Sequence, residues 1–201
     1  MKISIATEDI LTEEVMVKIL SSVSDIDIPF KLGKQGCGYL KKNIHKFNEL
    51  SYLHNVLVVF DSDSQTNINA FRSSIEKEIK NKSQSLDIII PVREIESWIL
   101  ADREGLSTFL NISGDKICRS PDDLLDPKEK IINLAKLSKN ADIRKGIPPK
   151  KGAASKVGLS YNTLLTRFVQ ESWDIDRAKA HSPSLCTALM TINRIISQVN
   201  S

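Results

Sequence analysis

The chain has 201 residues, of which 41% are hydrophobic and 26% charged, which is ordinary for a globular protein with a core of normal size. A formal net charge of +3 is too small to indicate nucleic-acid binding by itself. The 3 cysteines are scattered without a C-x-x-C spacing, which argues against a disulfide framework and a zinc site. No apolar run reaches about 18 residues, and no charged-then-apolar leader opens the sequence. We therefore expect a cytoplasmic protein with reduced thiols and without a membrane span.

Short apolar runs alternate with amphipathic repeats over the first half of the chain. After the first run, apolar residues recur at helical spacing from Leu11 to Val23, with Thr12 as the expected N-cap. Pro29 lies inside the second run and favours an edge position for it. The expected strands are 2–7, 26–32, 56–60 and 86–92, and helical patterns follow each of them.

Strands that alternate with helices at these lengths predict an α/β fold with right-handed crossovers. We place the first strand beside the third, and the fourth on the far side of the third. This arrangement gives a four-stranded parallel, Rossmannoid sheet of order 2-1-3-4. The expected α/β domain spans residues 1–110.

After about residue 111 the strand signals stop, and residues 111–201 are expected to form a helical extension. Asp126 followed by Pro127 predicts a helix start. A long loop is expected over 138–160, and its segment 139–156 is basic. Clustered lysines bind nucleic-acid phosphates without reading sequence, although a solvated surface loop shows the same pattern. The candidate nucleic-acid-binding residues in this loop are Lys145, Lys150, Lys151 and Lys156.

The apolar run 56–60 ends in two carboxylates, Asp61 and Asp63, and Glu8 follows the first expected strand. Because the carboxyl ends of neighbouring parallel strands meet at one edge of a sheet, we expect these three side chains to converge. Clustered carboxylates repel one another unless a cation lies among them, and oxygen ligands suit Mg²⁺ or Mn²⁺. The three are therefore candidate catalytic residues and metal ligands, although an Asp-x-Asp sequence is also common in solvated turns and helix caps.

Charged residues also follow the fourth expected strand. Glu94 and Glu96 are candidates to assist the three carboxylates in catalysis. Arg93 is a candidate to bind phosphate, or else pairs with one of these glutamates. The glycine-rich stretch 33–38 is suited to cradle a phosphate through backbone N–H groups, or is a flexible turn.

A glutamate after the first strand and an Asp-x-Asp sequence after the third resemble the TOPRIM domain of topoisomerases, primases and OLD-type nucleases. The resemblance covers roughly residues 1–100. It implies that Glu8 is a general acid or base and that Asp61 and Asp63 hold divalent metal. The stretches 8–13 and 93–102 further resemble small bacterial TOPRIM-like proteins of unknown function, some of whose relatives lie beside ATPases in phage-defence operons.

Two residues near Glu8 bear on this resemblance. TOPRIM domains usually carry glycine directly after the glutamate, where this chain has Asp9, which either adds to the metal site or indicates a rebuilt one. Glu13 lies near the position of a second acid in OLD-type nucleases, although a glutamate in a first helical turn is commonly solvated.

The resemblance implies a Mg²⁺-dependent or Mn²⁺-dependent nuclease that acts on nucleic-acid phosphodiesters, with DNA favoured over RNA. It also suggests an ATPase partner of the AAA or ABC type and a role in anti-phage defence, and a homodimer is a further option. The alternative is a catalytically inactive TOPRIM-like subunit that binds or regulates a partner. A remote alternative is a phosphatase of the haloacid-dehalogenase type, in which Asp-x-Asp follows the first strand.

Overall fold

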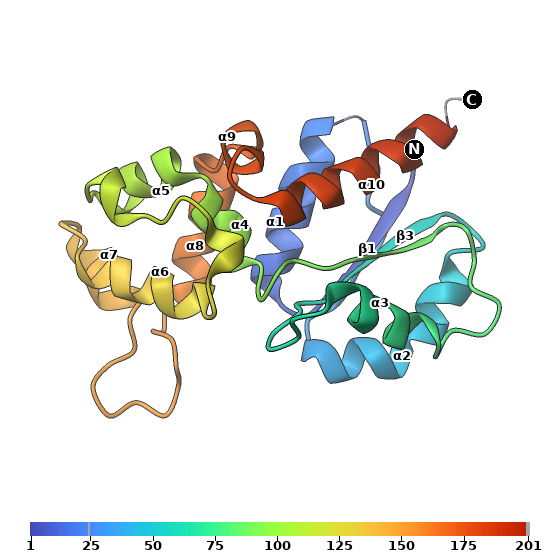
Figure 1. Ribbon diagram of the computed structural model, residues 1–201, viewed down its shortest axis with the longest axis horizontal. Coiled ribbons are helices and arrows are strands. Elements are labelled where there is room, and N and C mark those ends of the chain that lie inside the picture. The colour runs from blue at the N-terminus through green and yellow to red at the C-terminus, as the bar shows by residue number, and fades with distance from the viewer. Residues whose placement is uncertain (24, 200–201) are drawn as a thin grey trace. The chain divides into compact units, whose positions relative to one another are not determined.

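The computed structural model describes residues 1–23 and 25–199 and contains an all-parallel sheet of four strands (Figure 1). The strand order is β2-β1-β3-β4, so the predicted α/β fold and the order 2-1-3-4 are confirmed. The register pairs Ala6 with Val58 in the central pair of strands. The strands are β1 (Ile3–Thr7), β2 (Lys31–Gly33), β3 (Asn55–Val59) and β4 (Leu86–Ile89).

The chain divides into two compact units. The first consists of Met1–Val92 together with the chain from Cys186 onward, and the second consists of Arg93–Leu185. The sheet belongs to the first unit. The predicted division into an α/β domain over 1–110 and a helical extension over 111–201 stays a prediction.

Helices cover both faces of the sheet in the first unit. Helices α1 and α10 lie on one face, and α2 and α3 lie on the other (Figure 1). Each residue from Val56 to Phe60 is 0% exposed, which explains why this stretch is apolar without alternation. Arg194 of α10 pairs with Asp87 of β4 at 2.5 Å. The helices are α1 (Ile10–Val23), α2 (Gly36–Leu50), α3 (Ile68–Glu76) and α10 (Pro183–Val199).

Strand β2 is an edge strand, as Pro29 predicts, but it is shorter than the expected run 26–32. Proline has no backbone N–H and cannot take part fully in a ladder. Before Pro29 the chain makes an isolated bridge between Lys2 and Asp27, and continuous pairing begins at Lys31. Pro29 therefore marks the edge position of β2 and also accounts for its late start at Lys31.

Helix α1 is capped by Asp9, so the expectation that Thr12 is the cap is wrong. Asp9 Oδ1 accepts a hydrogen bond from the Thr12 N–H at 2.8 Å, which is the usual bond of an N-cap side chain. The Thr12 side chain is buried, and its hydroxyl has no hydrogen-bond partner among the described residues. Asp9 thus has a structural role at this helix start.

The second unit is helical. The predicted helix start is confirmed, because the Asp126 side chain accepts a bond from the Glu129 N–H at 2.6 Å. The expectation of a continuous loop over 138–160 is wrong, because Asn140 caps a short helix by accepting from the Asp142 N–H. Across residues 1–23 and 25–199, the structure contains no helix with the length and apolar character of a membrane span. The helices of this unit are α4 (Glu96–Ala101), α5 (Arg103–Leu110), α6 (Pro127–Lys136), α7 (Ala141–Gly146), α8 (Tyr161–Glu171) and α9 (Ile175–Lys179), and two short 3₁₀ turns are η1 (Gly114–Lys116) and η2 (Pro121–Asp123).

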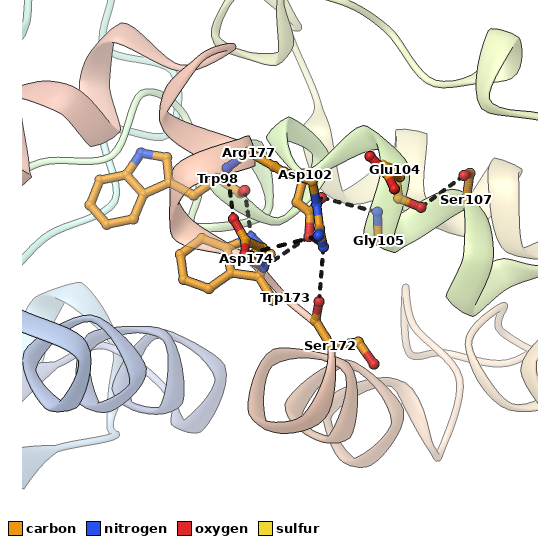
Figure 2. Close-up of polar contacts among 9 residues, drawn as sticks. All are labelled: Trp98, Asp102, Glu104, Gly105, Ser107, Ser172, Trp173, Asp174 and Arg177. Atoms are coloured by element: carbon orange, nitrogen blue, oxygen red, sulfur yellow. Dashed lines mark hydrogen bonds and ion pairs between the residues drawn. The ribbon is translucent and has the colours of Figure 1, made fainter.

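A buried carboxylate between α4 and α5 holds parts of the second unit together (Figure 2). Asp102 is 0% exposed and accepts hydrogen bonds from Arg177 Nε at 2.7 Å and Nη2 at 2.8 Å. It also accepts from the backbone N–H groups of Asp174 at 2.9 Å and Gly105 at 3.0 Å. A Cβ atom at Gly105 would lie 2.3 Å from Asp102 Oδ2, so a larger residue does not fit there. Charge-assisted bonds of this kind tie α5 and α9 to the end of α4.

Candidate active site at the carboxyl edge of the sheet

The carboxyl ends of β1 and β3 bring together Glu8 and Asp61, two of the predicted site residues. Because Ala6 is paired with Val58, the two strands leave the sheet side by side. Glu8 Oε1 accepts a hydrogen bond from the backbone N–H of Asp61 at 3.0 Å. The strand order reverses at this pair of strands, and open α/β sheets bind ligands at such a position.

Asp61 is buried, with 7% of its surface exposed, and its backbone is fixed on both sides. The N–H groups of Phe60 and Ser62 donate to carbonyls at the end of β4 and beyond it, at 3.0 Å and 3.3 Å. Together with the bond to Glu8, these contacts hold Asp61 between β1 and the continuation of β4.

Asp63 is exposed and lies in a tight turn. The Ser62 carbonyl accepts a bond from the Gln65 N–H at 2.8 Å across this turn. Asp63 has a φ angle of +46°, a left-handed conformation that aspartate adopts more readily than most residues. The negative charge of Asp63 raises the pKa of Glu8. Asp63 is therefore both a turn residue and an electrostatic neighbour of Glu8.

Glu8 titrates near neutrality. The pKa of Glu8 is raised from 4.5 to about 7, mainly by burial, and the charges of Asp63 and Asp9 contribute to this rise. Hydrogen bonds from the Asp61 N–H and the Cys37 thiol act in the opposite direction. A carboxyl group with such a pKa can both accept and release a proton at neutral pH, which is what general acid–base catalysis requires.

Cys37 also lies beside Glu8, although no sequence pattern predicts it as a site residue. Its half-buried thiol donates a hydrogen bond to Glu8, and burial, followed by the charge of Glu8, raises the pKa of the thiol. The Gly36 N–H donates to the Glu8 carbonyl at 2.9 Å, which places the first turn of α2 beside Glu8. The position of Cys37 could have been predicted from the pairing of β2 with β1. This pairing requires the loop after β2 to lie next to the residue after β1.

The glycine-rich stretch 33–38 closes against β1. The Lys34 N–H donates to the Thr7 carbonyl at 2.8 Å, and a Cβ atom at Gly33 would lie 2.1 Å from the same oxygen. Lys34 Nζ pairs with the Glu13 carboxylate at 2.7 Å. The Glu13 side chain is 6% exposed, so the expectation of a solvated glutamate is wrong. The Lys34 N–H and Nζ groups thus bind other groups of the protein, and these contacts give no support to a phosphate cradle.

The three predicted residues after β4 belong to the second unit. Lys128 Nζ lies 2.8 Å from Glu94 Oε1 and 3.6 Å from Glu96 Oε1. Glu96 is 1% exposed and accepts a hydrogen bond from the Tyr161 hydroxyl at 2.8 Å. Arg93 is partly exposed and has a φ angle of +63°. Assistance of the two glutamates to the three carboxylates and phosphate binding by Arg93 stay predictions.

The predicted nucleic-acid-binding lysines also belong to the second unit. Lys145 lies in the last turn of α7, and the other three lie on the loop that follows this helix (Figure 1). All four side chains are exposed, and none forms an ion pair within the residues that the structure describes. The three lysines of the loop are Lys150, Lys151 and Lys156.

Carboxylate oxygens are chemically suited to a hard divalent cation, and a cation at the carboxylates near Glu8 stays a prediction. Within the described residues, no three His, Cys, Asp or Glu side chains are grouped so that they hold a metal ion. Mg²⁺ does not need such a group, since it commonly takes one or two carboxylates and completes its shell with waters and substrate phosphates. The negative charges of Asp63 and Asp9 disfavour the ionised form of Glu8, and a cation beside them would reduce this repulsion.

Stability should depend on pH through Glu8. The folded chain binds more protons than the unfolded chain between the ordinary pKa of 4.5 and the folded pKa of about 7. The stabilising contribution is therefore complete below about pH 4.5 and is lost as pH rises through about 7. Because Glu8 is partly exposed, we expect it to amount to about 1 kcal/mol. Urea unfolding in EDTA at acidic and alkaline pH measures the change.

The Glu8→Gln variant should lose this part of the pH dependence and be more stable than the unmodified chain at pH 8. Glu78→Gln removes an exposed glutamate of the same unit and serves as the matched control. Identical pH profiles for Glu8→Gln and the unmodified chain would show that Glu8 has an ordinary pKa.

Comparison with known proteins finds no relative, since no protein-family model, curated protein or solved structure matches the chain.

Proposed function

We propose that this chain is a Mg²⁺-dependent nuclease of the TOPRIM type that hydrolyses nucleic-acid phosphodiesters. The main support is the hydrogen bond from the Asp61 N–H to Glu8 Oε1, which joins the glutamate after β1 to the aspartate after β3. These are the positions to which the TOPRIM resemblance assigns proton transfer and metal binding.

In this proposal Glu8 moves the proton. With a pKa of about 7, it can take a proton from an attacking water, or give one to a leaving oxygen, at neutral pH. The Asp61 N–H orients the carboxylate through Oε1, and the Cys37 thiol adds a second donor. Both donors hold the group in place while it changes its protonation state.

Asp61 and Asp63 would hold the cation, with the Glu8 carboxylate beside them. A bound Mg²⁺ or Mn²⁺ neutralises charge on the phosphate and lowers the pKa of the attacking water. Asp61 is suited to this role because its backbone is fixed by β1 and by the chain after β4. Asp63 is suited because it is exposed to incoming substrate.

Nucleic acid is the proposed substrate because exposed lysines without ion pairs gather on α7 and the loop after it, within the described part of the chain. Clustered cations of this kind bind phosphates and release counterions. DNA is the first substrate to test.

An inactive TOPRIM-like binding subunit is the second candidate, and Asp9 favours it. Asp9 caps α1 and adds negative charge beside Glu8, where TOPRIM domains usually have an uncharged glycine. Such a subunit would bind its partner without metal-dependent cleavage. A phosphatase of the haloacid-dehalogenase type has less support, because Asp61 follows the third strand of the chain.

Incubation of supercoiled plasmid with the full chain and Mg²⁺ or Mn²⁺ tests the proposal. We expect nicked and linear products with either cation and none in EDTA. Asp61→Asn should lower the rate at least about 100-fold, because a cation supplies several kcal/mol of charge stabilisation that this variant loses.

Asp25→Asn removes the same charge from an exposed position of the same unit and should cut at the unmodified rate. Cleavage that is insensitive to Asp61→Asn would overturn the site assignment. A folded chain that cuts plasmid with neither Mg²⁺ nor Mn²⁺ would favour the inactive subunit.

An ATPase partner, a place in anti-phage defence and a cytoplasmic location complete the proposal. The TOPRIM resemblance supports the first two. A reducing compartment is supported by the cysteines, which form no disulfide bond within the described residues; they are Cys37, Cys118 and Cys186.

A further inference from the structure

The loop 147–158 is closed at its base by contacts between its two ends. The Gly158 N–H donates to the Ile147 carbonyl at 2.8 Å, and the Ser160 N–H donates to the Gly146 carbonyl at 3.1 Å. The two ends approach so closely that a Cβ atom at Gly158 would lie 2.2 Å from the Gly146 oxygen. A compact loop with joined ends thus projects from between α7 and α8 (Figure 1).

A cavity of about 530 Å³ is lined by this loop, by α7 and by α8, and we name it the loop cavity. Its volume falls in the range of sites that bind small organic groups. Leu159 lies in its lining and is 94% exposed, which leaves a large apolar side chain open to a ligand. The other apolar side chains of the lining are Pro148, Ala153, Val157 and Leu164.

The charge around the loop cavity is positive. Lys145 and Lys150 line it, and Lys151 and Lys156 lie on the same loop. These four lysines form no ion pairs within the described residues, so their charge is available to a ligand. One acid, Asp142, is found in the lining. An apolar interior flanked by lysines suits a ligand with an apolar part and negative charges next to it.

We propose that the loop cavity binds one unpaired base of a single-stranded nucleic acid, with Lys145 and Lys150 on the phosphates beside that base. A single strand can turn a base away from its neighbours and into an apolar pocket, whereas a duplex keeps its bases stacked inside. This inference rests on the proposed function and adds to it that the substrate has a single-stranded segment.

Fluorescence anisotropy with a labelled 15-nucleotide thymidine strand, and with a duplex of equal length, tests the proposal. The full chain is used in EDTA, so that binding is measured without cleavage. We expect the single strand to bind at least about tenfold more tightly than the duplex, and Leu159→Asp to remove most of that difference. Leu125→Asp is the matched control, because Leu125 is a leucine of the same unit that is 82% exposed.

The double variant Lys145→Ala/Lys150→Ala should weaken single-strand binding. It should also reduce the slope of log K against log salt by about 1.4, since each phosphate contact on a single strand contributes about 0.7. Lys46→Ala/Lys77→Ala removes two exposed lysines of the first unit and should leave both quantities unchanged.

Equal affinity for single strand and duplex would overturn the proposal, as would single-strand binding that is unaffected by Leu159→Asp. Competition by poly-glutamate of the same length, as strong as that by the unlabelled single strand, would overturn it as well. Failure of the proposed function is a separate result: a chain that binds the single strand through Leu159 but cuts no plasmid keeps the loop cavity and loses the nuclease. A chain that cuts plasmid in a Glu8-dependent manner, but binds single strand and duplex with equal affinity, keeps the nuclease and loses the loop cavity.

Discussion

Glu8→Gln is expected to lower the rate of Mg²⁺-dependent cleavage by about 10²–10⁴-fold and to leave nucleic-acid binding in EDTA unchanged. Glutamine has nearly the same size, and its side-chain oxygen can still accept the bond from the Asp61 N–H. It cannot, however, exchange a proton. The comparison therefore isolates proton transfer from the shape of the site.

The pH profile of cleavage supplies a second measurement. With Glu8 as the base, the rate of the unmodified chain should rise with pH to an inflection no higher than about 7, because a nearby cation favours the ionised carboxylate. Glu8→Gln should show no such inflection, whereas Glu8→Asp should keep one at a reduced rate. Initial rates of plasmid nicking from about pH 5.5 to 9 give these profiles. A normal rate in Glu8→Gln would exclude Glu8 from proton transfer.

Asp102→Ala is expected to lower the free energy of unfolding by about 3–5 kcal/mol. The substitution leaves the guanidinium of Arg177 without its carboxylate and the N–H groups of Gly105 and Asp174 without their acceptor (Figure 2). Buried donors that lose a partner pay their full desolvation penalty. Such a loss is a large fraction of the stability of an ordinary domain. Urea unfolding followed by tryptophan fluorescence measures it, since Trp98 and Trp173 lie in this region.

Asp176→Ala is the matched control for Asp102→Ala. Asp176 also forms an ion pair, with Lys179 at 2.5 Å, but its side chain is 82% exposed. Exposed pairs contribute less than about 1 kcal/mol, so this variant should unfold close to the unmodified chain. Equal losses in the two variants would contradict the role of burial at Asp102.

The sheet could be predicted because its signals are local. The uninterrupted apolar run from Val56 to Phe60 indicates a strand covered on both faces, and Pro29 indicates an edge. The meeting of Glu8 with Asp61 is a consequence of strand order, since carboxyl ends of adjacent parallel strands share one edge. Residue type, periodicity and topology were sufficient for these features.

Other features depend on contacts that no local pattern encodes. Asp9 and Thr12 are both good N-cap residues, and only the start of α1 decides between them. A lone cysteine such as Cys37 carries no spacing signal, and its place beside Glu8 follows from the path of the loop after β2. Asp102 finds Arg177 at a separation of 75 residues, which the sequence around either residue does not indicate.

The route of the chain also affects how the protein is made. All four strands lie within the first 92 residues, but the part of α10 from Cys186 onward is synthesised after the whole of Arg93–Leu185. This part belongs to the same unit as the strands and contains the buried Ile192 and Ile195. At about 5–20 residues per second, roughly 100 residues take about 5–20 seconds to translate. For that time the nascent sheet lacks its last covering helix and presents apolar surface on the ribosome. The second unit is complete before the first, so the earliest part of the chain to be synthesised is the last to reach its native packing.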